Sequence, residues 1–326
     1  MDAGTMTPIH IVLATNASGV GLLRVALYSL FRTSSDPRAL AVHVFASGLS
    51  AADKSGLRAV AALFRGGRVD IVDRNADAFS DVACANKSIP PEACLRFLIP
   101  DVLRDAPRAI YLDIDVLCRA DIAGLWNIPM DGAVCLGSDK EWAHPAYARK
   151  IGLGDDDVYI NSGVMVWDLR KFREEGLAER MIEAVRGYGR NLPCVDQDVI
   201  NLELRGRIGT FSHLWNYTTF EYKTKFGERK DAKLLHFTNV PKPWNLRSFG
   251  WRDREWWRAK LGMELRLLLA RFRRPDDAAD LPSASYFRTR PPCSGARRPT
   301  SFDRAAAERA VRGELTVVNV PHAFAG

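Results

Sequence analysis

The sequence predicts an α/β fold with a mainly parallel central sheet. Residues 9–14, 41–45 and 68–72 are short apolar segments of the kind that forms buried strands. Between them, residues 20–31 and 52–64 carry apolar side chains at helical spacing. Strands that alternate with helices are joined by right-handed crossovers and run parallel. We therefore expect ligands to bind at the carboxyl ends of these strands.

The rest of the pattern adds further elements to this unit. The expected helices lie at 90–103, 169–188 and from 196 onward, and the expected strands at 133–136, 159–167 and 233–237. The strand at 159–167 is unusual because Asn161 and Ser162 interrupt its apolar run, which suggests a bulge or the wall of a site. Acidic residues open the helix at 196, where the helix dipole favours them.

Composition places the chain among globular proteins. It has 326 residues, of which 47% are hydrophobic and 26% charged, and a net charge of +7 that suits anionic partners. Its six cysteines show neither CxxC spacing nor a zinc-ligand pattern. No leader-like segment and no apolar run of membrane-spanning length is visible, so we expect a cytoplasmic protein.

Two carboxylates follow an apolar strand at residues 109–112. Asp113 and Asp115 are separated only by Ile114, and side chains at i and i+2 of an extended strand point the same way. Two adjacent anions repel unless a cation lies between them, and a hard divalent ion such as Mg²⁺ or Mn²⁺ is the natural partner. A strand end followed by a turn, where aspartate is common, explains these residues equally well on their own.

Phosphate-binding glycine motifs are missing. No GxGxxG follows the first strand, and no GxxxxGK[ST] occurs anywhere in the chain. A dinucleotide fingerprint and a P-loop are therefore both excluded. If phosphates bind here, a metal ion and side chains must hold them.

Four segments in order resemble the retaining sugar-nucleotide glycosyltransferases of family 8, which include bacterial lipopolysaccharide α-galactosyl- and α-glucosyltransferases and glycogenin. They are 111–115, 159–164, 196–201 and 236–244, and the resemblance spans about 9–244. It implies the GT-A type fold of nucleotide-diphospho-sugar transferases. It also implies an enzyme that moves galactose or glucose from UDP-galactose or UDP-glucose to a hydroxyl of a glycan, such as lipopolysaccharide. No nucleic acid partner is expected.

The resemblance assigns roles to particular residues. Asp113, Asp115 and His236 would bind Mn²⁺, with Mg²⁺ as the alternative, because a histidine nitrogen suits Mn²⁺ better. On its own, His236 reads more simply as a satisfied histidine at a strand end. Gln197, nearest the anomeric carbon, and Asp196 are the expected catalytic residues. Because an amide is a poor nucleophile, we favour front-face substitution over a covalent intermediate. The other expected donor contacts are Ala14, Asn16, Arg96, Ile114, Asp139 (with Ser138 as its competitor), Asn161, Asn239 and Lys242.

Two positions depart from the family pattern. Asn16 stands where an aspartate usually reads the uracil edge, and Asn239 where a glycine usually lets the backbone approach phosphate. These changes motivate one alternative, an inert metal-dependent sugar-nucleotide binder. The other alternative is a phosphatase of the haloacid-dehalogenase type, whose nucleophile is the first Asp of such a motif. That fold needs the motif on its first strand and a hydroxyl residue where this chain has Leu117.

We expect three regions along the chain. Residues 1–250 would form the catalytic domain, 251–275 a basic amphipathic helix, and 276–326 a Pro/Arg-rich tail with little order. The helix segment combines eight Lys/Arg with Trp256 and Trp257, which suits peripheral contact with an anionic membrane. A terminal helix packed on the catalytic domain is the simpler alternative.

Overall fold

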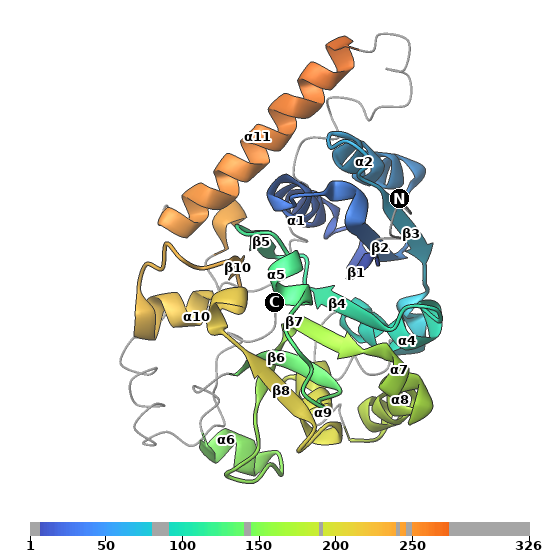
Figure 1. Ribbon diagram of the computed structural model, residues 1–326, viewed down its shortest axis with the longest axis vertical. Helices are drawn as coiled ribbons and strands as arrows, with labels where there is room; N and C mark the ends of the chain where they lie inside the picture. Colours follow the sequence, from blue (N-terminus) through green and yellow to red (C-terminus); the bar gives the residue numbers. More distant parts are fainter. Residues whose placement is uncertain are drawn as a thin grey trace, which may run out of the picture.

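A seven-stranded sheet forms the centre of the computed structural model, which describes residues 7–79, 91–139, 145–188, 192–238, 242–245 and 250–273 (Figure 1). Its strands are β1 (Ile9–Asn16), β2 (Leu40–Ser47), β3 (Val69–Asp73), β4 (Arg108–Leu112), β6 (Cys135–Asp139), β7 (Ile160–Asp168) and β8 (Ile208–Phe211). They lie in the order β3-β2-β1-β4-β7-β6-β8. β7 runs antiparallel to both of its neighbours, and every other pair in this sheet is parallel. The predicted mainly parallel α/β sheet is confirmed.

A small second sheet lies next to the carboxyl end of β4. It contains β5 (Val116–Cys118), β9 (Tyr217–Thr218) and β10 (Leu234–His236), in the order β5-β10-β9. β10 is antiparallel to β5 and parallel to β9. Because β5 begins four residues after β4 ends, residues 113–115 form the link between the two sheets.

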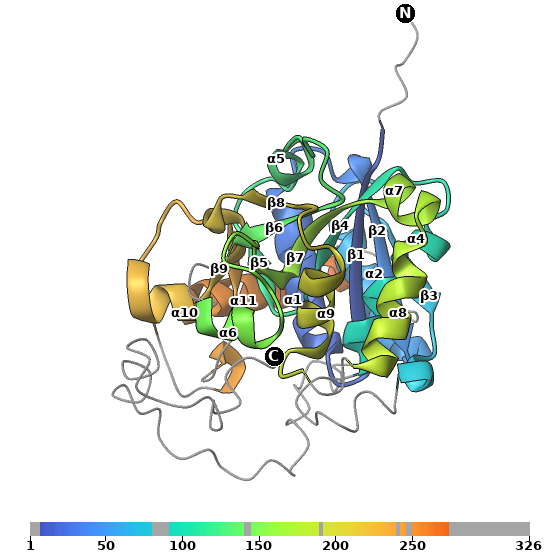
Figure 2. The same ribbon diagram turned by 90° about the horizontal axis from the view of Figure 1, so that it is seen from below.

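Helices cover both faces of the large sheet. The α-helices are α1 (Val20–Thr33), α2 (Ala51–Ala62), α4 (Ile99–Val102), α5 (Ala123–Trp126), α6 (Pro145–Lys150), α7 (Leu169–Glu174), α8 (Leu177–Gly187), α9 (Val195–Glu203), α10 (Thr219–Glu221) and α11 (Trp251–Arg273). Tighter or wider turns form η1 (Pro37–Ala39), η2 (Ala76–Phe79), η3 (Pro91–Leu98), η5 (His213–Asn216), η6 (Tyr222–Phe226) and η7 (Pro243–Asn245). Figure 2 shows α8 and α9 in front of the strands and α1 and α11 behind them.

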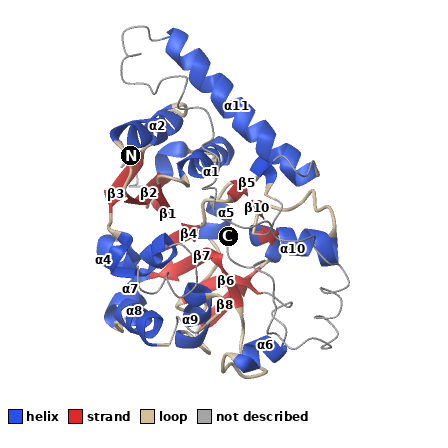
Figure 3. Cartoon of the chain, turned by 180° about the vertical axis from the view of Figure 1, so that it is seen from behind, coloured by secondary structure: helices blue, strands red, loops and turns tan. Residues whose placement is uncertain are grey.

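Two hydrophobic cores lie on opposite faces of the large sheet. Ile11 and Leu13 of β1 belong to the core beneath α1, α2 and α11, whereas Val12 belongs to the core beneath α7, α8 and α9. All three side chains are buried, as expected for a parallel strand that is covered on both faces. Figure 3 shows the two helical layers on either side of the strands.

Three expected elements differ most from the structure. The helix predicted over 90–103 is instead η3 followed by α4, because Pro100 has no N–H with which to continue the preceding turn and can stand only near the start of a new helix. The helix predicted over 169–188 divides into α7 and α8 at Gly176, whose φ of 60° is left-handed. The strand predicted at 133–136 starts later and extends to Asp139.

The expected bulge within 159–167 is present. Along the β6–β7 ladder Gly137 pairs with Met165, but the next residue, Ser138, pairs with Asn161. The extra residues of β7 between these two pairs bend that strand where its polar side chains lie.

Helix α11 has two different faces. Its inner side chains, Trp256, Ala259, Met263 and Leu267, are buried in the core shared with α1 and α2. Its outer side chains, Leu261, Leu265, Leu268, Leu269 and Phe272, are 47–75% exposed. The buried Arg252 of its first turn donates to the carbonyls of Tyr217 (3.1 Å) and His236 (2.6 Å). Among the described helices, none has the length and apolarity needed to cross a bilayer.

Candidate active site

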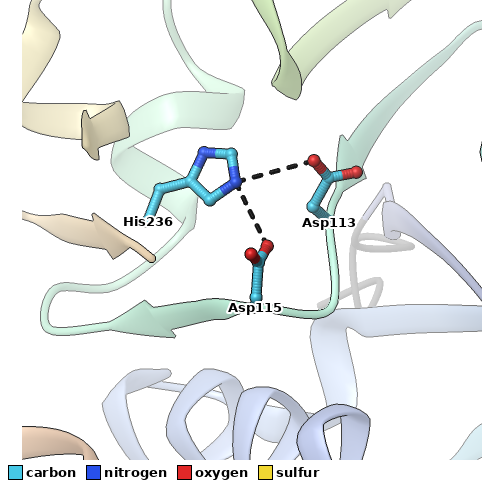
Figure 4. Close-up of side chains that lie close together, drawn as sticks. All are labelled: Asp113, Asp115 and His236. Atoms are coloured by element: carbon cyan, nitrogen blue, oxygen red, sulfur yellow. Dashed lines mark ion pairs between the residues drawn. The ribbon is translucent and has the colours of Figure 1, made fainter. Parts of the chain in front are cut away.

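Three side chains from two separate segments converge beside the carboxyl end of β4. Asp113 and Asp115 follow β4, and His236 is the last residue of β10. In Figure 4 both carboxylates point toward one ring nitrogen, Nε2, which lies 3.6 Å from Asp113 Oδ2 and 3.1 Å from Asp115 Oδ1. One ligand atom from each residue lies within 4.8 Å of the other two. A single cation can therefore contact all three.

Backbone hydrogen bonds fix the position of this group. The Asp113 N–H donates to the carbonyl of Gly163 in β7 (2.8 Å), and the Phe237 N–H donates to the carbonyl of Asp115 (3.0 Å). His236 pairs across the β5–β10 ladder with the residue that follows Asp115. Hydrogen bonds to β7 and to the residue after β10 thus fix the link that carries the two carboxylates beside the imidazole.

Gly163 leaves the space that the metal-ligand group occupies. A Cβ on this residue would lie 2.2 Å from His236 Cε1 and 2.5 Å from Asp113 Oδ2. Both distances are far shorter than van der Waals contact, so only glycine fits with the three side chains in their present positions.

Arg96 of η3 is a buried cation on one side of the group. Its guanidinium lies 3.1 Å from both Asp113 Oδ1 and Asp196 Oδ2, and it donates to the carbonyl of Ser162 at 2.8 Å. The guanidinium also stacks over the ring of Tyr111 at 4.2 Å. Burial alone would lower the pKa of Arg96, but the nearby carboxylates outweigh it and raise that pKa. Arg96 is therefore a fixed positive charge.

Lys242 is a second cation, and it pairs with the Asp115 carboxylate. Its ammonium lies 2.8 Å from Asp115 Oδ2 and also donates to the carbonyl of Phe237. Burial acts to raise the pKa of Asp115, yet Lys242 and His236 outweigh it and hold that pKa well below its usual range. For Asp113, in contrast, burial raises the pKa more than Arg96 and His236 lower it. Asp113 is thus the carboxylate of the pair whose charged form its surroundings stabilise less.

One buried oxygen in the group faces the imidazole. Asp115 Oδ1 is fully enclosed, and its near polar neighbour within the described part of the chain is the Nε2 atom of His236, at 3.1 Å. Two carboxylate oxygens and an imidazole nitrogen form a donor set that suits Mn²⁺ and also accepts Mg²⁺. The residues present therefore fit a divalent cation.

The start of α9 brings two more predicted residues to the same place. Asp196 and Gln197 are buried in its first turn. Gln197 Oε1 accepts hydrogen bonds from Asn161 Nδ2 (2.8 Å) and from the Ser162 N–H (3.1 Å), and Asp196 accepts from the Ser162 hydroxyl (3.2 Å). The bulged part of β7 thus joins α9 to the carboxylate pair.

The carboxyl end of β1 lies against the link between the sheets. Ala14 is buried, and Asn16 ends the strand. The Asn16 amide oxygen accepts from the Ser18 N–H (3.0 Å), the Ser18 hydroxyl (2.6 Å) and the Gly19 N–H (3.3 Å). A Cβ on Gly19 would lie only 2.5 Å from Ile114 Cδ1. The turn after β1 and residue 114 are therefore neighbours, but the Asn16 oxygen is already used within its own turn.

Two predicted positions cannot be placed in full. Asp139 is the last residue of β6, and its side chain lies outside the described part of the chain. Its competitor Ser138 is buried. Asn239 lies outside the described residues.

Sequence reasoning missed the residues that support this group. The Tyr111 hydroxyl donates to Asp113 Oδ1 (3.0 Å), the Tyr159 hydroxyl donates to Asp198 (2.6 Å), and Asn216 Oδ1 lies 2.9 Å from His236 Nδ1. Tyr111 and Tyr159 stand within the family-like segments, so their proximity to the acidic residues was a usable signal. Asn216 follows no motif, and nothing in the sequence marks it.

Comparison with known proteins identifies the family. The model of glycosyl transferase family 8 matches residues 10–247. General stress protein A of Bacillus subtilis is 24% identical over 253 residues, covering 73% of this chain and 87% of that protein. The lipopolysaccharide 1,2-glucosyltransferase of Escherichia coli is 29% identical over 153 residues, covering 42% of this chain and 44% of that enzyme.

Solved structures show the same fold. The galactosyltransferase LgtC in complex with donor and acceptor sugar analogues superposes with a TM-score of 0.68 at 24% identity, covering 77% of this chain and 95% of that one. The glycosyltransferase GlyE of Streptococcus pneumoniae gives a TM-score of 0.60 at 19% identity, covering 79% and 63%. The fold is therefore of the GT-A type, and the chain belongs to glycosyl transferase family 8.

Proposed function

We propose that this glycosyltransferase moves galactose or glucose from a UDP-sugar to a hydroxyl of a surface glycan, with retention of configuration and with Mn²⁺ as its metal. The observation that carries the proposal is the convergence of Asp113, Asp115 and His236, which bring one ligand atom each to within 4.8 Å of one another. The lipopolysaccharide glucosyltransferase among the relatives supports the choice of sugar and acceptor class.

The residues around this group suit the departure of a nucleoside diphosphate. A bound divalent ion would stabilise the negative charge that develops on the β-phosphate. Lys242 lies on Asp115 and Arg96 on Asp113, so both place positive charge beside the residues that would hold the metal. Lys242, the less buried of the two, would contact the phosphate. Arg96 would hold its present contacts and keep Asp113 in place.

Gln197 is poorly suited to act as a nucleophile. Its amide oxygen already accepts two hydrogen bonds, from Asn161 and from the Ser162 N–H, and its amide nitrogen donates to the Tyr159 hydroxyl (2.7 Å). An amide held at both ends can present a dipole to the sugar but is not free to form a covalent bond with it. We therefore favour front-face substitution, in which a phosphate oxygen of the leaving group takes the proton of the acceptor hydroxyl.

The first test measures UDP release from a panel of UDP-sugars with and without Mn²⁺, beside the Asp115→Ala variant. We expect release from UDP-galactose or UDP-glucose that requires Mn²⁺ and is lost in the variant. Tight Mn²⁺-dependent UDP binding with no release, even with glycan acceptors added, would favour an inert binder instead. If no UDP-sugar binds, the assignment of this donor site is wrong.

We further propose that helix α11 contacts an anionic membrane with its outer face. Five large apolar side chains on that face are 47–75% exposed, while the inner face is buried against α1 and α2. Arg258 and Arg254 belong to the same helix and would pair with lipid phosphates. The alternative of a helix packed on the catalytic domain accounts for the inner face only.

Flotation with vesicles tests this second proposal. The protein should bind vesicles that contain phosphatidylglycerol, bind pure phosphatidylcholine much less, and lose binding when Leu265 and Leu269 are both replaced by serine. Equal flotation of the double variant and the unmodified protein would contradict the proposal.

A further inference from the structure

A continuous chain of side-chain hydrogen bonds starts at His236 and runs away from the metal-ligand group. His236 Nδ1 lies 2.9 Å from Asn216 Oδ1, and Asn216 Nδ2 donates to Asn161 Oδ1 at 2.9 Å. Asn161 Nδ2 then donates to Gln197 Oε1 at 2.8 Å. Three amides from η5, β7 and α9 thus link a metal ligand to the residue expected nearest the reacting sugar carbon.

This series of hydrogen bonds ends on a buried carboxylate. Gln197 Nε2 donates to the Tyr159 hydroxyl (2.7 Å), which in turn donates to Asp198 Oδ1 (2.6 Å). Asp198 has no exposed surface and also accepts from the Tyr147 hydroxyl (2.7 Å) and the Cys194 N–H (2.9 Å). With three donors on its two oxygens, Asp198 is a fixed acceptor at this end.

Two backbone N–H groups determine which way every amide in the chain points. The Gly163 N–H donates to Asn161 Oδ1 (3.1 Å), and the Ser162 N–H donates to Gln197 Oε1 (3.1 Å). A backbone N–H can only donate, so the atoms that it faces must be amide oxygens and not nitrogens. The orientations of both amides are therefore assigned by the backbone rather than by choice of rotamer.

This polarity decides which nitrogen of His236 donates to Asn216. Because Asn161 presents its oxygen, Asn216 must present its NH₂ to Asn161 and its own oxygen to the imidazole. An amide oxygen only accepts, so Nδ1 must carry a proton. Nε2 is then the ring nitrogen that faces Asp113 and Asp115, and it is the atom that a divalent cation would contact. The hydrogen-bonded series therefore orients the imidazole for metal binding.

We propose that Asn216 is a positioning residue with two separable tasks: its oxygen keeps His236 ready to bind the divalent metal, and its NH₂ orients Asn161 and Gln197 toward the donor sugar. The second task rests on the proposed transferase function, whereas the first depends only on metal binding. Tyr159 acts at the far end of the chain, where its hydroxyl fixes Gln197 without reaching the metal ligands.

Two substitutions of Asn216 separate the tasks. Asn216→Asp keeps an oxygen that can accept from the Nδ1–H of His236. Its second oxygen, however, would face Asn161 Oδ1 and repel it, because Asn161 Oδ1 is kept in place by the hydrogen bond from the Gly163 N–H. Asn216→Ala removes both contacts. By titration calorimetry with Mn²⁺ alone, we expect Asn216→Asp to bind within about threefold of the unmodified protein and Asn216→Ala to bind on the order of 10- to 100-fold more weakly.

Turnover should separate the variants differently. With the donor sugar that the panel identifies, both Asn216 variants should lose on the order of 10-fold or more in kcat. Tyr159→Phe should lose kcat while its Mn²⁺ affinity stays unchanged, because it lies beyond Gln197 on the chain. The exposed Asn127, at the end of α5, provides the matched controls Asn127→Asp and Asn127→Ala, and thermal melting verifies that each variant is folded.

A direct readout of the tautomer does not depend on activity. Long-range ¹H–¹⁵N spectra of the protein saturated with Mg²⁺, a diamagnetic ion, with His236 assigned by its loss in His236→Gln, should show Nδ1 protonated and Nε2 unprotonated in the unmodified protein, and the form with a proton on Nε2 gaining population in Asn216→Ala. An unprotonated Nδ1 in the unmodified protein, or unchanged Mn²⁺ affinity in Asn216→Ala, would overturn the proposal. Failure of UDP-sugar turnover in the unmodified protein would instead refute the proposed function and leave the tautomer result intact.

Discussion

Replacing Gly163 with alanine should destroy the metal site while leaving the protein folded. The new Cβ would lie 2.2 Å from His236 Cε1 and 2.5 Å from Asp113 Oδ2, so the imidazole and the carboxylate must each retreat by roughly 1 Å to reach ordinary contact. Metal ligands are tolerated only within about 0.2 Å of their ideal distances. We therefore expect Mn²⁺ affinity to fall on the order of 100-fold, or about 2.7 kcal/mol, with an overpacking cost to stability of about 1–3 kcal/mol.

Calorimetric titration with Mn²⁺ measures the affinity, and urea denaturation measures the stability. Gly209→Ala is the matched control for overpacking. Its Cβ would lie 2.6 Å from Leu136 Cδ2, so it crowds the same sheet, but it contacts neither Asp113, Asp115 nor His236. Gly21→Ala controls for the glycine change itself, since its Cβ would meet no atom of the described residues within 4 Å. If Gly163→Ala bound Mn²⁺ as tightly as Gly209→Ala, the reasoning from close approach would be refuted.

Three further predictions concern the charges around the metal ligands. At about 100 times its Kd, Mn²⁺ should stabilise the protein by about 2.7 kcal/mol and raise Tm by roughly 5 °C in a thermal melt, with no shift in Asp115→Ala; a shift in that variant would place the metal elsewhere. Lys242→Gln should bind Mn²⁺ alone about tenfold more tightly, because a competing cation is lost, yet bind UDP with Mn²⁺ about tenfold more weakly; calorimetry would contradict this if both affinities moved together. Arg96→Lys should lose the fork that joins Asp113 to Asp196 and unfold about 2–3 kcal/mol more easily in urea, and an unchanged midpoint would count against that role.

Local pattern was enough to predict the elements that lead into the site. The alternation of strands and helices puts Asp113 and Asp115 at the ligand-binding edge of a parallel sheet. The expectation that they lie in an extended strand was wrong, because β4 ends at Leu112 and residues 114–115 form a turn before β5. Family resemblance added His236, which lies 121 positions beyond Asp115 in the sequence and reaches it only through the pairing of β10 with β5. That pairing is tertiary and leaves no trace in the periodicity of either segment.

The misplaced elements have local causes that a periodicity count overlooks. Apolar spacing over 90–103 looks helical, but Pro100 cannot donate to the preceding turn, so η3 and α4 replace a single helix. Apolar spacing over 169–188 continues across Gly176, whose left-handed backbone changes the direction of the chain. Asn216 could not be predicted for a different reason. Its role depends on the partners of its amide oxygen and nitrogen, His236 and Asn161, which come together only when η5, β7 and β10 have packed.

Arg252 changes how deletions of the C-terminal helix should be interpreted. From the first turn of α11 it supplies a buried donor to the carbonyl of His236, and Trp256 and Met263 complete the core behind α1. A chain shortened to residues 1–250 would lose the hydrogen bond to the backbone of His236, a proposed metal ligand, together with the outward apolar face. Loss of activity in such a truncation would therefore not be evidence that membrane attachment is required for catalysis. Point substitutions at Leu265 and Phe272, which are 56% and 75% exposed, remove the outer face alone and answer that question directly.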